Sequence, residues 1–247
     1  MPGSPASPPS FEGFPPEAFA WFAGLEADNS KAWFTAHRGT YDRAVRGALE
    51  AMLDELAGEL GGEVRMFRQN RDVRFSADKS PYKTTTYGLI VDRPDDLPTL
   101  YAQLSATGLF AGAGYHMMAP DQLGRFREAV VDDLAGAELE QAIAAAEAVG
   151  IETFGEALKT APRGYPRDHP RVRLLRHKAL GAGRRLPAGA DGAVPNGGGG
   201  GIAREAALEH ARATWAGCAP LSAWLEAHVG PSQVVVESRY GRRRRSG

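Results

Sequence analysis

The spacing of apolar residues changes twice along this chain, and that change constrains the fold more than any other feature. Between residues 40 and 60 apolar side chains recur every three or four positions, which predicts an amphipathic helix that Gly61–Gly62 ends. From Thr85 to His116 the chain is rich in β-formers, with alternating stretches and a turn at Thr107–Gly108, which predicts strands. Helical spacing returns after Pro120. Helices followed by strands and again by helices are typical of an α+β domain rather than of βαβ units.

These patterns predict elements with approximate bounds. A first helix begins near Pro15–Pro16, where proline is tolerated in the first turn, and Asp28 or Asn29 caps a short second helix. The other predicted elements are strands at 64–67, 71–75, 85–91, 100–105 and 109–116, helices at 120–131 and 137–149, a short basic helix at 170–180, and two final helices at 203–217 and 220–229. Together they predict a single α+β domain over residues 11–229, in which an antiparallel sheet of about four or more strands is packed by N-terminal and C-terminal helices.

Three segments lie outside these patterns. Residues 1–10 are rich in proline and serine and are predicted to be disordered, and the glycine-rich residues 187–201 are predicted to be a flexible insertion. Residues 230–247 form a tail that ends in the basic run Arg242–Arg245. Such a run binds nucleic acid weakly and with strong salt dependence, and a solvated tail is the simpler interpretation.

Charge and cysteine content restrict the function classes. A formal net charge of −1 over 247 residues gives no basic excess, so any attraction to phosphate must be local. Cys218 is the single cysteine, which rules out an internal disulfide and a zinc site built on paired cysteines. The first residues lack the pattern of a signal peptide, and no run of about 18 apolar residues predicts a membrane span. We therefore expect a cytoplasmic protein with no membrane contact.

The segment Arg71–Lys83, with the sequence RDVRFSADKSPYK, is the strongest candidate for a site. It mixes charged side chains with the apolar Val73 and Phe75, a combination that is costly to fold unless the charges pair or meet a ligand. As a strand followed by a turn, it would direct arginine forks and lysine point charges toward one anion. The candidate ligand-binding residues in it are Arg71, Arg74, Lys79, Tyr82 and Lys83.

Two main interpretations of this segment stay open. In the first, its cations bind an anionic small molecule, a phosphate or a carboxylate, while Asp72 and Asp78 orient the cations or act as acid–base groups. In the second, Asp72–Arg74 and Asp78–Lys83 ion pairs form a structural network, which is common in proteins and implies no catalysis. The second interpretation describes a non-catalytic structural or protein-binding module.

Other motifs are weaker. The S-x-x-K spellings Ser76–Lys79 and Ser80–Lys83 match the spacing of a serine nucleophile, but Pro81 lies inside the second and no K-T-G strand follows. Asp72, Asp78 and Lys79 have the composition of a metal-dependent phosphodiester site, at a spacing that many surfaces share. The six histidines lack the spacing of a helix-based metal site, so we assign no metal ligand. Nucleic-acid binding through the segment and the tail is the weakest alternative.

Five motifs resemble one family. They are FEGF (11–14), DNSKAWF (28–34), RDVRFSADKSPYK (71–83), LSATGLFAGAGYH (104–116) and LKTAPRGYPRDHPRVRLLRHK (158–178). They are similar to a bacterial and fungal family described as a domain of unknown function, over about residues 11–229. The resemblance implies a single α+β domain and no established reaction, cofactor or catalytic set.

The motif at 158–178 is the natural partner of Arg71–Lys83 if the fold brings the two together. It contains Arg163, a further candidate for anion binding, and Tyr165, which would pack a proline-rich loop over the sheet in the alternative interpretation. The candidate catalytic residues are Asp72, Asp78, Lys83 and His169. The sequence thus names a candidate site without naming a reaction, a cofactor or an oligomeric state.

Overall fold

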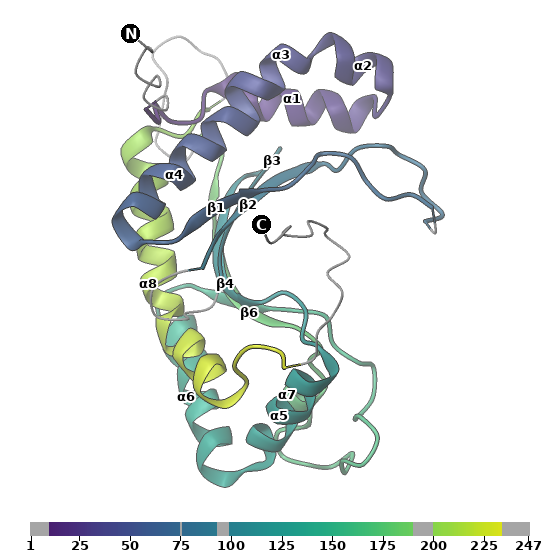
Figure 1. Cartoon of the computed structure of the whole chain (residues 1–247), viewed down its shortest axis with the longest axis vertical. Helices are drawn as coiled ribbons and strands as arrows, with labels where there is room; N and C mark the ends of the chain where they lie inside the picture. Colours follow the sequence, from purple (N-terminus) through teal and green to yellow (C-terminus); the bar gives the residue numbers. More distant parts are fainter. Residues whose placement is uncertain (1–9, 75, 93–98, 190–199, 234–247) are drawn as a thin grey trace, which may run out of the picture.

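The structure, a computed structural model, describes residues 10–74, 76–92, 99–189 and 200–233. A twisted sheet has long helices on one face, short helices at its upper end and further helices at its lower end (Figure 1). The predicted α+β class is confirmed. The predictions for residues 1–10, for 187–201 and for the basic tail fall mostly outside the described residues. At the described ends of the predicted insertion, the Gly189 amide donates to the Gly201 carbonyl at 3.0 Å.

The first helices follow the predicted apolar spacing. They are α1 (Pro16–Ala27), α2 (Lys31–Ala36), α3 (Arg38–Thr40), the π-helical η1 (Tyr41–Gly47) and α4 (Ala48–Leu60). Helix α1 begins at Pro16 and buries Phe19, Phe22 and Leu25. The predicted helix at 40–60 corresponds to η1 and α4, and Gly61, whose φ is 75°, follows its end.

The cap of α2 differs from the prediction. Ser30 is the N-cap, and its Oγ accepts a hydrogen bond from the Trp33 amide at 3.1 Å. The predicted cap by Asp28 or Asn29 is therefore wrong. The Asn29 side chain instead bonds to the backbone of Tyr82, far away in sequence.

Six antiparallel strands form one sheet in the order β1-β2-β3-β4-β6-β5. Their bounds are β1 Glu63–Met66, β2 Thr85–Val91, β3 Leu100–Ser105, β4 Gly108–Tyr115, β5 Glu152–Phe154 and β6 Leu180–Pro187. The predicted strands at 64–67, 85–91, 100–105 and 109–116 are confirmed within a residue or two. Sequence reasoning missed β5 and β6, so the sheet continues past β4, where the prediction ended.

Two predicted elements are wrong in part. Residues 71–74 form a loop rather than a strand, because their side chains bond within the loop, and Phe75 lies outside the described residues. The predicted helix at 170–180 is confirmed only as α7, Val172–Leu175, and Leu180 already begins β6.

Strand register separates two faces of the sheet. Thr86, Leu104 and Leu109 are aligned neighbours on β2, β3 and β4, and all three are buried beneath the helices. Tyr87, Gln103 and Phe110 form the next aligned row, and alternation points them to the opposite face. That second face is only partly buried, and it is the concave side of the sheet in Figure 1. We call it the open face.

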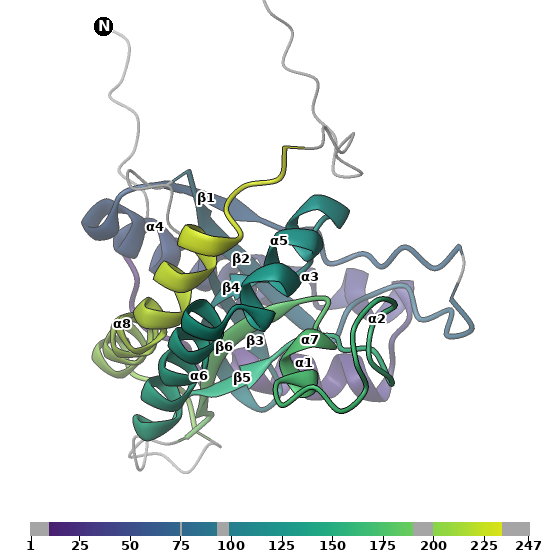
Figure 2. The ribbon, with the colours of Figure 1, turned by 90° about the horizontal axis from the view of Figure 1, so that it is seen from below.

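The later helices complete the covered side. Helices α5 (Pro120–Val131) and α6 (Asp133–Ala148) lie between β4 and β5 in the chain, and α8 (Arg204–His228) follows β6. Helix α6 packs beside α8 (Figure 2), where Trp224 Nε1 donates to the Ala135 carbonyl at 2.8 Å. The two predicted C-terminal helices are one helix that continues through Pro220. Buried Trp215 and Trp224 lie on either side of this proline, and their packing offsets the hydrogen bond that it removes.

None of the helices within the described residues, including the 25-residue α8, combines the length and apolar character needed to cross a membrane.

Candidate functional site

The Arg71–Lys83 segment lies in the long loop between β1 and β2, at the right of Figure 1. The Arg71 amide donates to the Pro81 carbonyl at 2.8 Å, and the Lys83 amide donates to the Gln69 carbonyl at 2.9 Å. An isolated antiparallel bridge joins Asn70 to Tyr82 between these bonds. We call residues 69–71 and 81–83 the loop base, and residues 72–80 the loop tip.

The loop base is held by the second motif of the resemblance, at 28–34. Asn29 Nδ2 donates to the Tyr82 carbonyl and Asn29 Oδ1 accepts from the Tyr82 amide, both at 3.1 Å. The Tyr82 ring stacks on Phe34 with their centroids 4.1 Å apart. The Asn29 side chain therefore satisfies the backbone amide and carbonyl of Tyr82, as a neighbouring strand would, and it links the loop to the N-terminal helices.

Gln69 is a buried polar centre of the loop base. Its Oε1 accepts from Thr86 Oγ1 at 2.8 Å and from the Tyr41 hydroxyl at 3.4 Å, while its Nε2 donates to the Lys83 carbonyl. Burial raises the pKa of Tyr41, so its hydroxyl keeps the proton that it donates. These bonds fix the backbone position of Lys83.

The loop tip is held by ion pairs. Arg74 meets Asp72 through two bonds, Nη2 to Oδ2 at 2.6 Å and Nε to Oδ1 at 2.9 Å. Asp78 pairs with Arg71, rather than with Lys83 as the network interpretation expects, and it also accepts from the Ser80 hydroxyl at 2.6 Å. Lys79 Nζ donates to the Val73 carbonyl at 3.0 Å.

Both carboxylates of the tip are held in the ionised form. The side chain of Arg74, together with its amide, lowers the pKa of Asp72 to about 2. Hydrogen bonds from Ser80, assisted by Arg71, hold the pKa of Asp78 still further below its usual range. A general base needs a pKa near the working pH, so these two groups are suited to fixing charges rather than to moving protons.

A cavity of about 460 Å³ opens beside the loop base, and we call it the base cavity. Its lining brings together Arg71, Asp78, Tyr82 and Lys83 of the predicted site. The remaining lining residues are Glu26, Asn29, Ser80, Thr84 and Thr85. The predicted residues Asp72, Arg74 and Lys79 do not line it.

Lys83 lines this cavity together with Arg71. Its Nζ donates to the Arg68 carbonyl at 2.6 Å and lies 4.8 Å from the centre of the Tyr87 ring. Burial, and secondarily the charge of Arg68, lowers the pKa of Lys83. Within the described part of the chain Lys83 forms no ion pair, so its charge is incompletely compensated.

The segment 158–178 lies at the other end of the sheet, at the lower right of Figure 1. There the His169 ring accepts a hydrogen bond at Nδ1 from the Arg171 amide at 3.0 Å, and its carbonyl accepts from the Val172 amide. Arg163 is exposed in the same segment. Neither Arg163 nor His169 lines the base cavity, so the structure does not bring this segment and the loop base into one site.

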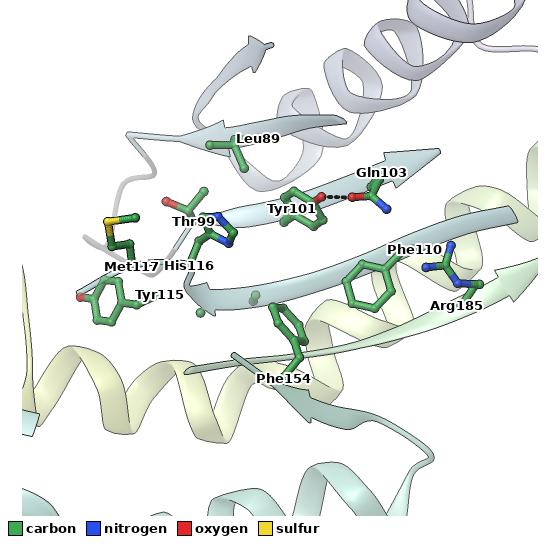
Figure 3. Close-up of a pocket in the computed structure, with 12 residues that line it drawn as sticks. Leu89, Thr99, Tyr101, Gln103, Phe110, Tyr115, His116, Met117, Phe154 and Arg185 are labelled. Carbon is green, nitrogen blue, oxygen red and sulfur yellow. Dashed lines mark hydrogen bonds between the residues drawn. The ribbon is translucent and has the colours of Figure 1, made fainter. Parts of the chain in front are cut away.

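A second cavity, of about 500 Å³, lies on the open face of the sheet (Figure 3). We call it the open-face cavity. Side chains from β2 to β6 point into it, and they are mostly aromatic or apolar. Its lining consists of Leu89, Thr99, Tyr101, Gln103, Phe110, Ala113, Gly114, Tyr115, His116, Met117, Phe154 and Arg185.

Sequence reasoning missed the open-face cavity, although a signal for it was present. Alanine and glycine alternate in β4 (AGAG, 111–114) and again in β6 (GAG, 181–183). The alanines are buried under the helices, and the glycines fall on the open face.

A comparison with protein families identifies the chain. The family model described as "Conserved hypothetical protein (DUF2461)" matches residues 17–190. The chain belongs to the DUF2461 family. The resemblance inferred from the motifs is thereby confirmed, and the match spans every residue that lines either cavity. The comparison with curated proteins gives no match.

In residues 10–74, 76–92, 99–189 and 200–233, no three His, Cys, Asp or Glu side chains are grouped so as to hold a metal ion. Cys218 is buried, its Sγ lies 3.2 Å from the Ala182 carbonyl, and burial raises the pKa of its thiol to about 11. A thiol in that state is a poor nucleophile.

Proposed function

We propose that this DUF2461 protein binds an anionic small molecule, a phosphate or a carboxylate, in the base cavity. The supporting observation is Lys83, a half-buried ammonium group beside a second cation, with no carboxylate partner among the described residues. A lysine in such surroundings pays a desolvation cost that a bound anion would offset.

Two neighbours of Lys83 complete the proposed contacts. Arg71 lines the same cavity, and Asp78 and Ser76 occupy only part of its five-donor fork. Tyr82 lines the cavity as well, and its backbone is fixed by Asn29. The proposal therefore centres on Arg71, Tyr82 and Lys83, and it gives Arg74, Lys79 and Arg163 no direct contact.

The test compares two lysines of the same loop. Inorganic phosphate and acetate are titrated by calorimetry into the wild type, Lys83→Met and Lys79→Gln at low salt. We expect one of the anions to bind at least tenfold more weakly to Lys83→Met and within twofold of wild type to Lys79→Gln, since only Lys83 lines the cavity. Equal affinity in both variants, or no binding of either anion to the wild type, would overturn the proposal. Thermal unfolding verifies that each variant is folded.

A second candidate is a structural or protein-binding module. The Asp72–Arg74 and Arg71–Asp78 pairs favour it, because they satisfy much of the loop's charge internally. Under this alternative no small anion binds, and the loop tip is a rigid surface feature. Nucleic-acid binding and metal-dependent phosphodiester chemistry gain no support, because Asp72 does not share the base cavity with Asp78. A cytoplasmic location stays part of the proposal on the ground of the single cysteine.

A further inference from the structure

Three aromatic rings from three different strands form the wall of the open-face cavity (Figure 3). Tyr101 of β3 and Phe110 of β4 have centroids 6.0 Å apart at an interplanar angle of 65°. Phe110 and Phe154 of β5 follow at 5.5 Å and 73°. Successive rings are thus edge to face, and the side chains remain partly exposed on the cavity side.

Glycines beneath the rings make this arrangement a fixed part of the fold. A Cβ atom at Gly183 would lie 2.4 Å from Phe110 Cζ, and one at Gly181 would lie 2.7 Å from Phe154 Cζ. No other residue could occupy these positions without moving the rings. The rings of the two phenylalanines therefore pack directly against the backbone of β6, and the space above them stays open.

The Gln103 amide lies beside these rings and is hydrogen-bonded to Tyr101. The Tyr101 hydroxyl donates to Gln103 Oε1, and burial raises the pKa of Tyr101, so the hydroxyl keeps its proton. With Oε1 engaged, the Gln103 amide nitrogen is left as a donor, and it makes no hydrogen bond within the described ranges of the chain. It points toward the space beside Phe110 (Figure 3).

The charge of the cavity is positive. Arg185 Cζ lies 5.6 Å from the centre of the Phe110 ring, and Arg185 Nη1 donates to Ser105 Oγ at 3.1 Å. The lining contains no aspartate or glutamate, and Arg185 forms no ion pair within the part of the chain that the structure describes. A guanidinium held above a ring in this way favours an anionic group next to an aromatic one.

We infer that the open-face cavity binds a planar heteroaromatic molecule of one or two fused rings that carries an anionic substituent. The ligand ring packs against Phe110 and Phe154, and its anionic group meets Arg185 and accepts from the Gln103 amide. A cavity of about 500 Å³ with apolar walls and a few convergent polar groups is typical of small-molecule sites. This site is independent of the base cavity, since the two linings share no residue.

The experiment uses three probes of matched size on the full chain. Indole-3-carboxylate is planar and anionic, hydrindane-2-carboxylate is anionic but not planar, and indole-3-methanamine is planar but cationic. Affinities are measured by ligand-observed NMR titration. We expect indole-3-carboxylate to bind at least tenfold more tightly than either of the others, and Arg185→Gln and Phe154→Ala each to weaken it at least tenfold. Arg38→Gln, an exposed arginine on α3, serves as the matched control and should leave the affinity unchanged.

Three results would overturn the inference. The first is the absence of indole-3-carboxylate binding. The second is equal binding of the three probes, which would indicate unspecific apolar contact. The third is unchanged affinity in both Arg185→Gln and Phe154→Ala. Because Arg185 and Phe154 are exposed, both variants are expected to fold, and their thermal unfolding checks this.

Discussion

The base and the tip of the β1–β2 loop come from one continuous motif, yet they are built by different means. The base is partly buried, with Gln69 and Tyr82 inside, and it is held by neutral hydrogen bonds that reach Asn29, Tyr41 and Thr86, all outside the loop. The tip is exposed and held by ion pairs, one of which is formed wholly within it. In this loop, the densely charged residues therefore pair with one another, whereas polar, uncharged residues fix the loop to the rest of the domain.

The same contrast separates the cations by role. Arg74 meets a carboxylate inside the tip and Lys79 a carbonyl, so removing either leaves the base unchanged. Lys83 lies on the base and lines the base cavity, and it forms no ion pair within the described residues. We therefore expect the cations of this one motif to differ in role according to the contacts that hold each of them.

Gln69→Ala is the substitution with the largest expected effect. It removes the acceptor of Thr86 and Tyr41 and the donor to the Lys83 carbonyl, all in a buried site. We expect a loss of about 2–4 kcal/mol in the free energy of unfolding, because buried polar groups are left without partners. Urea denaturation measures it. Asp72→Ala, in the exposed tip, is the control and should leave the unfolding midpoint nearly unchanged. A larger loss of stability in Asp72→Ala than in Gln69→Ala would contradict this difference between the tip and the base.

Asn29→Ala is expected to have the next largest effect. The substitution removes both bonds to the Tyr82 backbone and frees the loop from the N-terminal helices. A loss of about 1–3 kcal/mol is expected for a partly buried pair of this kind. Asn29→Asp keeps the acceptor and loses the donor, so it should fall between wild type and alanine. If Asn29→Ala unfolds at the wild-type urea concentration, Asn29 does not anchor the base.

Most of the fold could be predicted from the sequence, since apolar spacing is set by which residues must be buried. Strands β2, β3 and β4 and the helices before them follow directly from it. Strand β6 could not be predicted, because its open-face residues Gly181 and Gly183 have no side chain to make an alternating pattern. The continuous α8 was divided wrongly at Pro220, where the burial of two tryptophans outweighs local propensity.

The candidate site was predicted in part. The sequence pointed to the β1–β2 loop, part of which lines the base cavity, and the predicted Asp72–Arg74 pair is present. The sequence could not show that Asp78 pairs with Arg71 instead of Lys83. It also could not show that the segment containing His169 lies at the other end of the sheet, because this placement depends on contacts between segments far apart in the chain. The open-face cavity was missed altogether, since it is assembled from five strands.

The smallest expected effect is the acid titration of the tip. Because Arg74 lowers the folded-state pKa of Asp72 to about 2, the pair stabilises the fold above the ordinary value of 3.8 and is lost as the pH falls toward 2. An NMR titration of the Asp72 carboxyl carbon should give a midpoint near 2 in the wild type and a higher midpoint in Arg74→Ala, which loses the guanidinium but keeps the backbone donor of residue 74. A wild-type midpoint at 3.8 would mean that the tip pair does not form in solution.

The central claim, that Lys83 is held for an anion, is tested most directly by the pKa of its ammonium group. NMR of lysine-labelled protein gives this value with and without inorganic phosphate or acetate, and Lys83→Met assigns the signal. The account predicts a pKa below the ordinary 10.5 in the free protein, because burial disfavours the charge, and a rise when the ligand anion is added. A pKa at the ordinary value, or one that neither anion changes, would contradict it.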